Sequence, residues 1–237
     1  MKIKTIIFLC HFLLALTLSV QAQSRNASID VGLDLMTRFV WRGMSLSTSP
    51  VIQPYLEYNK GNLIIGSWAS YTFAKEPYQE LDMYVSYSVG SFTLTLNDYF
   101  SPVDSLFTTH NYFDWSKGST SHALEAILQV GDFQNLPMSF TAAVMLYGND
   151  LDENGDNYFS TYLELGYDFS IGEQAVQAFV GLTPKESLYS DQLNVVNLGI
   201  ALSKELPVTD LLSLPLLASL SINPDNETVH FVAGLSF

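Results

Sequence analysis

The sequence predicts an all-β fold: an up-and-down antiparallel transmembrane β-barrel of about 12 strands that follows a cleaved signal peptide. Apolar and polar residues alternate in about twelve segments, which is typical of strands with one apolar and one polar face. The connections between these segments are alternately long and short, as in outer-membrane barrels. Charged residues make up only 14% of the chain, against about 25% in soluble domains.

The first residues have the three parts of a secretory signal peptide. Lys2 and Lys4 form a basic start, an apolar run covers residues 6–20, and Val20-Gln21-Ala22 is a small-residue cleavage site. We therefore predict a signal peptide at 1–22 and an outer-membrane β-barrel at 23–237. The apolar run is too short and too early for a convincing membrane-spanning helix.

Charge and cysteine content exclude several classes of site. Removing residues 1–22 takes away two lysines and no acid, so the formal net charge changes from −14 to −16. Such an acidic chain is a poor binder of nucleic acid, because phosphate contacts need clustered Lys and Arg. Cys10 is the only cysteine and lies in the predicted signal peptide, so the mature chain has no thiol for a disulfide or a nucleophile.

The strands follow from this alternation in chain order. The clearest is the fourth, where Leu81, Met83 and Val85 alternate with Asp82 and Ser86. The predicted strands lie near residues 27–36, 51–58, 63–71, 80–89, 92–97, 124–130, 138–146, 159–169, 176–182, 196–203, 216–222 and 227–237. Between them we predict long loops at 37–50, 101–120, 148–157 and 183–192, and short links that include 59–62, 90–91 and 206–211.

The final strand has one wholly apolar face and ends on an aromatic residue. Val229, Phe231 and Leu235 share the apolar face, and His230 lies on the other. Such a strand is typical of the closing strand of a bacterial outer-membrane barrel, so we expect the barrel assembly machinery and outer-membrane lipid as partners. The alternative is a periplasmic sandwich or lipocalin-like barrel, which would bury the apolar face in a core.

Eight acidic residues share the polar, inward face of the predicted strands, and two arginines near the first strand could pair with them. A charged lumen sets the field that a permeating ion meets, so these residues predict a preference for cations. Pairing between the acids and basic residues inside a narrow, plugged barrel is the alternative. The candidate lumen-lining residues are Asp30, Asp34, Arg38, Arg42, Glu57, Glu80, Asp82, Glu125, Glu164 and Asp168. Aromatic residues near strand ends, including Trp41, Trp68, Tyr87 and Tyr167, are expected in girdles at the membrane interfaces.

An acidic stretch at 150–156 is a candidate Ca²⁺ site. Asp150, Asp152, Asn154 and Asp156 match the first half of a Ca²⁺ loop, but Thr161 stands where the distal Glu should be. A solvated acidic loop is the preferred interpretation, with Ca²⁺ as the alternative and no other cofactor expected.

A hydrolase would need a serine and a histidine on one face. His230 shares its inward face with Ser219 and Ser221 on the neighbouring strand, although no catalytic motif surrounds them. We therefore predict that the chain is not an enzyme.

Short pieces of the sequence together resemble the TorF-like porin family, also known as the Gcw_chp family, of Gram-negative bacteria. They are Trp41-Arg42-Gly43 with Ser45 and Ser47, Pro50 with Gln53, Gly66-Ser67-Trp68-Ala69-Ser70, Glu80-Leu81-Asp82 with Tyr84, Tyr162-Leu163-Glu164, and Asn197-Leu198-Gly199. The resemblance implies a Gram-negative outer-membrane barrel with pore function and carries no catalytic residues. Pro54 after Gln53 departs from the family pattern.

The resulting functional prediction is a porin that passes small hydrophilic solutes or ions with a preference for cations. The first alternative is a barrel that binds or adheres at the cell surface through its long loops. The second is an outer-membrane lipid hydrolase, which would depend on Ser221 and His230.

Overall fold

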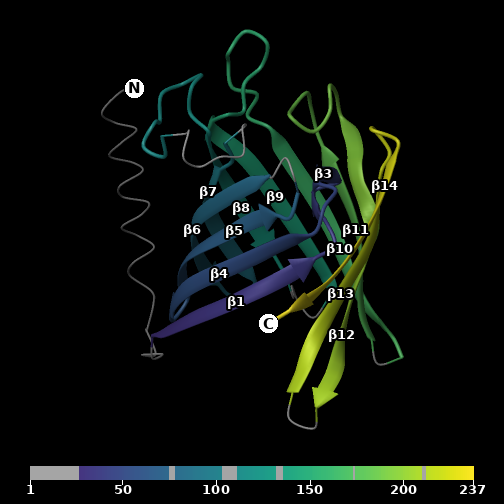
Figure 1. Cartoon of the computed structure of the whole chain (residues 1–237). Coiled ribbons are helices and arrows are strands. Elements are labelled where there is room, and N and C mark those ends of the chain that lie inside the picture. Colours follow the sequence, from purple (N-terminus) through teal and green to yellow (C-terminus); the bar gives the residue numbers. More distant parts are fainter. Residues whose placement is uncertain (1–26, 75–77, 103–110, 132–135, 173, 210–211) are drawn as a thin grey trace.

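Twelve antiparallel strands form a closed barrel, as the sequence predicts. The computed structural model describes residues 27–74, 78–102, 111–131, 136–172, 174–209 and 212–237 (Figure 1). The barrel strands are β1 (Ser28–Met36), β4 (Val51–Lys60), β5 (Leu63–Thr72), β6 (Gln79–Val89), β7 (Phe92–Phe100), β8 (His122–Val130), β9 (Met138–Gly148), β10 (Thr161–Ile171), β11 (Gln174–Thr183), β12 (Asn194–Thr209), β13 (Leu212–Asn223) and β14 (Thr228–Ser236). Each strand pairs with its neighbour in the sequence of barrel strands, and β14 pairs with β1 to close the ring.

The predicted signal peptide at 1–22 lies outside the described residues. No helix among the described residues is long and apolar enough to cross a membrane.

The alternation of side chains places apolar residues on the outer face. Along β14, Val229 and Phe231 are each 61% exposed, whereas His230 between them is 6% exposed. Along β6, Val85 is 46% exposed and Ser86 is 8% exposed. Outward aliphatic and aromatic side chains recur on the other strands, so the outside of the barrel is apolar and the inside is polar.

Glycines inside the barrel leave room for tyrosine rings from the neighbouring strand. A Cβ added to Gly32, Gly66 or Gly181 would lie 2.3, 2.4 or 2.1 Å from a side-chain atom of Tyr55, Tyr84 or Tyr162, respectively. Each tyrosine ring covers the backbone of the glycine that it approaches, where no side chain is present, and so keeps the inner wall packed.

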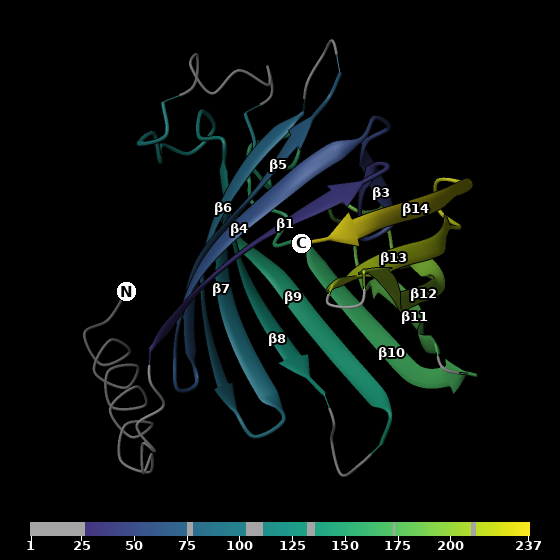
Figure 2. The same cartoon turned by 60° about the horizontal axis from the view of Figure 1, so that its bottom comes forward.

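The short turns lie at one end of the barrel and the longer connections at the other (Figures 1 and 2). The β12–β13 hairpin extends beyond the other strands at the short-turn end (Figure 1). The link predicted at 206–211 is wrong in this respect, because β12 continues to Thr209 and β13 begins at Leu212. Proline is unfavourable inside a strand, but Pro215 pairs with Glu205 and Pro207 pairs with Ser213, with a register shift directly after Pro207.

The segment 37–50, predicted as a loop, contains a two-stranded hairpin of β2 (Phe39–Trp41) and β3 (Met44–Ser47). Its two-residue turn is Arg42-Gly43, with φ angles of 49° and 80°. Two successive positive φ angles are the requirement of a type I′ turn, which usually carries Asn-Gly. Arginine is rare in this conformation, so the residues of this turn are a weak signal for a hairpin.

Candidate functional site in the barrel interior

The β2–β3 hairpin lies inside the barrel rather than above it. Its tip touches the inner wall at β13, two strands from β1 in the ring, where the Asn223 side-chain amide donates a hydrogen bond of 3.2 Å to the carbonyl oxygen of Gly43. A Cβ on Gly43 would lie 2.0 Å from the carbonyl oxygen of Val196, so only glycine allows this approach. The hairpin tip is therefore fixed against β12 and β13, which are three and two strands from β1 in the ring.

Arg42 joins the hairpin tip to the wall through Glu125 of β8. The guanidinium donates two hydrogen bonds to the carboxylate, Nη1 to Oε1 at 2.6 Å and Nη2 to Oε2 at 3.0 Å. The side chain of Glu125 is fully buried and that of Arg42 is 11% exposed. Tyr99 donates a further hydrogen bond of 2.7 Å to Oε2. Both charges are thus paired, which a buried ion pair requires.

Aromatic rings enclose the guanidinium of Arg42. Its Cζ lies 4.6 Å from the ring centroid of Trp41 and 4.8 Å from that of Tyr162. Nη1 also donates to the hydroxyl of Tyr189, which comes from the connection between β11 and β12. These contacts add cation–π attraction to the ion pair. The hairpin and the β11–β12 connection together fill the upper part of the interior.

A hydrogen-bond network holds the β11–β12 connection in this position. Asp150 accepts hydrogen bonds from both the backbone N–H and the hydroxyl of Ser160. The Ser160 hydroxyl oxygen in turn accepts the backbone N–H of Leu188 at 2.8 Å. Leu188 and Tyr189 pack with the hairpin residues Trp41 and Met44 in one apolar cluster.

All eight carboxylates predicted to line the lumen lie on the inner face of the barrel. Four of them accept a tyrosine hydroxyl: Glu57 from Tyr84, Glu80 from Tyr78, Glu125 from Tyr99, and Glu164 from Tyr162. Asp30 accepts from the amide of Asn59 and Asp168 from that of Gln177. One oxygen of Asp34 and one of Asp82 are buried without a hydrogen-bond partner.

Among these eight described carboxylates, Glu125 alone forms an ion pair with an arginine. The expectation that Arg42 pairs with an inward acid is confirmed. Arg38 forms no ion pair with any of the eight. The β2–β3 hairpin and the β11–β12 connection together form a plug, which the neutral Arg42–Glu125 ion pair joins to the barrel wall. The other seven predicted carboxylates on the wall have no arginine partner within the described part of the chain.

Two of the aromatic residues expected at the membrane interfaces lie inside the barrel. Trp41 is on the hairpin, and Trp68 shares the inward face of β5 with Gly66 and Ser70. The ring of Trp68 contacts that of Phe39 at a centroid distance of 5.5 Å. The prediction of a girdle position was wrong for both, and strict alternation along β5 would have placed Trp68 correctly. Tyr87 and Tyr167 are on the outer face, 40% and 49% exposed.

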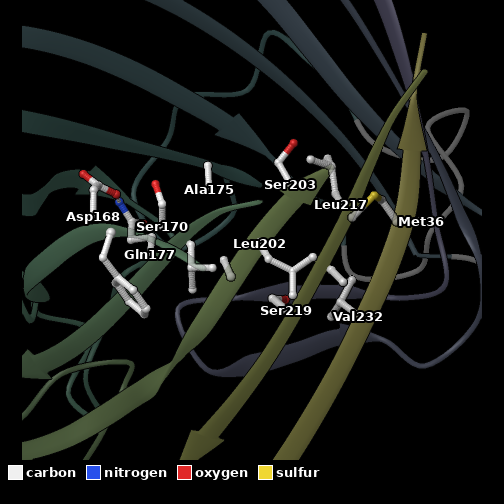
Figure 3. Close-up of a pocket in the computed structure, with 14 residues that line it drawn as sticks. Met36, Asp168, Ser170, Ala175, Gln177, Leu202, Ser203, Leu217, Ser219 and Val232 are labelled. Atoms are coloured by element: carbon white, nitrogen blue, oxygen red, sulfur yellow. Dashed lines mark hydrogen bonds between the residues drawn. The ribbon is translucent and has the colours of Figure 1, made fainter. Parts of the chain in front are cut away.

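A cavity of about 660 Å³ occupies the interior between β10 and β14, towards the short-turn end. Figure 3 shows the polar side chains of Asp168, Ser170 and Gln177 on one side of it. Leu217 and Met36 lie on the other side. The space below the plug is therefore open enough to hold small solutes.

The four candidate Ca²⁺ ligands are not gathered around one point. Asp150 is committed to Ser160, and Asp152 Oδ1 accepts the backbone N–H groups of Asn154 and Asp156, each at 2.8 Å. No group of three or more metal-ligating residues occurs in the described part of the chain. The pKa of Asp152 is lowered, first by the backbone N–H of Asp156 and then by that of Asn154, because these donors favour the carboxylate. These four residues thus form an acidic turn.

The serine and histidine of the hydrolase alternative are neighbours without a catalytic contact. Ser221 lies directly opposite His230 in the β13–β14 register. His230 Nε2 is 3.2 Å from the hydroxyl of Thr228, and its Nδ1 is buried without a partner. Within the described residues, His230 forms no hydrogen bond with Ser219 or Ser221.

Neither the scan of protein-family models nor the search of curated proteins gives a match to this chain. The resemblance to the TorF-like porin family accordingly stays a prediction.

Proposed function

We propose that this chain is a non-enzymatic outer-membrane barrel of a Gram-negative bacterium that passes small hydrophilic solutes, with a preference for cations. The observation that carries this proposal is the excess of inward carboxylates, of which Glu125 alone has an arginine partner among the described residues. A wall of uncompensated negative charge attracts cations and repels anions. The lumen cavity gives such solutes room below the plug.

The membrane location is supported by the outer face. Exposed apolar side chains on every side of a closed barrel would be costly in water and are satisfied in lipid. We expect the purified protein to stay folded in detergent and to change its gel mobility on boiling. A stable, detergent-free monomer in solution would contradict the membrane location.

The β2–β3 hairpin acts in this proposal as the constriction. It fills the upper interior and is held by side-chain contacts of Arg42 and Asn223 rather than by strand pairing with the wall. Small movements of the hairpin would widen the path without opening the barrel.

Planar-bilayer recording tests the transport proposal. In a KCl gradient the reversal potential should indicate cation preference, and replacing Asp168 by Asn should reduce that preference because the carboxylate faces the lumen cavity. Replacement of Asp156 by Asn, in an outer loop, removes the same charge and serves as the control. Absence of conductance in both the wild type and a chain that lacks residues 38–48 would refute the proposal.

Surface binding is the second candidate, and the 111–121 connection favours it. Phe113 in this connection is 82% exposed, an unusual position for a large apolar side chain outside the barrel wall. A barrel that binds cells or surfaces but conducts no ions would support this alternative.

A further inference from the structure

Aromatic rings gather around two neighbouring inward carboxylates, Glu80 and Asp82 of β6. Two rings come from the hairpin and three from the barrel wall or the residue just before β6. They are Phe39, Trp41, Trp68, Tyr78 and Tyr99, with centroid distances of 5.5 Å for Phe39–Trp68, 5.9 Å for Phe39–Tyr78 and 5.6 Å for Trp41–Tyr99. We name these five rings and two carboxylates the acid-aromatic site.

The strand register explains why the rings and acids meet. Asp82 lies opposite Trp68 on β5 and opposite Tyr99 on β7. Because directly opposite residues in antiparallel strands point to the same face, one inward carboxylate is flanked by two inward aromatic side chains. The hairpin then presents Phe39 and Trp41, which alternate with Val40, towards the same region.

The two carboxylates have no cationic partner. Glu80 is 4% exposed and accepts hydrogen bonds from the hydroxyls of Tyr78 and Ser101. Asp82 is 7% exposed, and its Oδ1 is buried without any hydrogen-bond partner. Within the described residues no Lys, Arg or His forms an ion pair with either one. A buried carboxylate oxygen in this condition is costly, and a positively charged ligand nearby would lower that cost.

A cavity of about 300 Å³ adjoins Glu80 and the three rings of Trp41, Tyr78 and Tyr99. Its remaining lining is mostly apolar, with Met44, Leu46, Ala123, Met145 and Leu188, and includes the polar side chains of Ser101, Ser121 and Asn149. This volume is larger than a bare ion needs and is enough for a small organic molecule. The lining thus offers negative charge on one side and aromatic and aliphatic surface on the others.

We propose that the acid-aromatic site binds a small organic ammonium ion. Aromatic faces attract such cations and carboxylates neutralise them, and a partly apolar cation also benefits from the aliphatic lining. A divalent metal is disfavoured because it would need about six oxygen ligands, and the described residues contain no group of three or more His, Cys, Asp or Glu that could hold one. Arg42 does not oppose the ion, because Glu125 neutralises its charge.

This inference rests on the proposed function, since the site lies beside the hairpin on the route through the barrel. It specifies an organic ammonium compound as the class of cation that the barrel selects. Binding at the site can nevertheless be measured in the absence of any ion current.

Calorimetric titration of the detergent-solubilised full chain tests the site. The probe is tetramethylammonium chloride, with sodium chloride as a control for bare charge and tert-butanol as a neutral compound of similar shape. Tetramethylammonium should bind saturably and the two controls should not. Equal responses to tetramethylammonium and tert-butanol would overturn the proposal.

Three variants assign the binding to these residues. Glu80→Gln should lower tetramethylammonium affinity at least tenfold. Phe39→Leu, on the hairpin and so outside the barrel wall, should lower it severalfold without changing charge, because the Phe39 ring packs on Tyr78 of the cavity lining. Glu153→Gln removes a carboxylate from an outer loop and should leave affinity unchanged. Boiling-dependent gel mobility checks that each variant is folded, and Phe39→Leu remains informative if Glu80→Gln does not fold.

The outcomes separate the two proposals. Unchanged affinity in folded Glu80→Gln and Phe39→Leu would overturn the acid-aromatic site even if the barrel conducts cations. Saturable, Glu80-dependent binding by a barrel without conductance would keep the site and refute the transport function.

Discussion

Replacing Arg42 by Met should weaken the attachment of the hairpin to the barrel wall. The substitution removes both hydrogen bonds from Arg42 to Glu125, at 2.6 and 3.0 Å. The fully buried carboxylate of Glu125 then keeps the hydrogen bond from the Tyr99 hydroxyl. Breaking a buried ion pair from one side costs about 3–5 kcal/mol. The lost cation–π contacts are part of the same change and are not added separately.

The hairpin should absorb this cost, because it is not part of the closed sheet. If the free energy that holds the hairpin against the wall is smaller than about 3–5 kcal/mol, the Arg42→Met hairpin leaves the interior. The free energy of unfolding of the barrel then falls only by that smaller amount. We therefore expect a lower free energy of unfolding together with a higher single-channel conductance. Guanidinium unfolding in lipid vesicles, followed by tryptophan fluorescence, measures the first, and planar bilayers measure the second.

The double variant Arg42→Met/Glu125→Met provides the decisive comparison. Apolar residues of similar size can replace a buried ion pair at little cost, so the double variant should recover most of the lost stability. Lys117→Met breaks the exposed pair with Asp156, 3.2 Å long, and should change stability by less than about 1 kcal/mol. If Arg42→Met is as stable as the wild type, or the double variant is no better than the single one, the ion pair does not hold the hairpin.

Three further predictions concern the two faces of the barrel wall, the packing of its inner face and an outer loop. Val85→Arg should lower folding yield in vesicles, since an arginine near the bilayer midplane costs about 2–4 kcal/mol. Ser86→Arg should fold and shift the reversal potential, because Ser86 faces the interior. The reverse result would mean that the apolar face is the inner face of the barrel. Gly66→Ala should lower the free energy of unfolding by about 1–3 kcal/mol, because the new Cβ would overlap a tyrosine ring, while Gly131→Ala meets no atom within 4 Å and should be neutral in the same vesicle assay. The lowered pKa of Asp152 means that its turn stabilises the carboxylate, so local protease resistance should hold above the ordinary aspartate pKa of about 3.9 and fall below it; Asp152→Asn should lose this pH dependence.

The barrel wall could be predicted because alternation is a local property of each strand. Val229 and His230 of β14, and Val85 and Ser86 of β6, occupy the faces that their polarity predicts. The same argument placed the inward carboxylates correctly, from Asp30 to Asp168. Their partners were not predictable, because Tyr78 and Tyr162 lie two residues from the acids they bind, and nothing in the alternation says that a tyrosine hydroxyl will turn towards the same acid.

The plug could not be predicted because its contacts are distant in sequence. Arg42 meets Glu125 and Tyr189, 83 and 147 residues away, and Gly43 meets Asn223, 180 residues away. A two-residue turn with arginine at positive φ is unfavourable by itself, so these tertiary contacts must stabilise it. The sequence could nominate Arg42 as a partner for an acid but could not choose among eight.

Position near a strand end does not distinguish an aromatic residue inside the barrel from one in a membrane girdle. Trp41 and Trp68 lie near strand ends, which suggested an interface, but both are on the inward side of their strands. A tryptophan that faces a polar interior is unusual, because a wall lined with water does not need a large aromatic side chain. Trp68 lies directly opposite Asp82, whose Oδ1 is buried without a hydrogen-bond partner, and the proposed ammonium site would account for this combination of an aromatic ring and an unpaired acid.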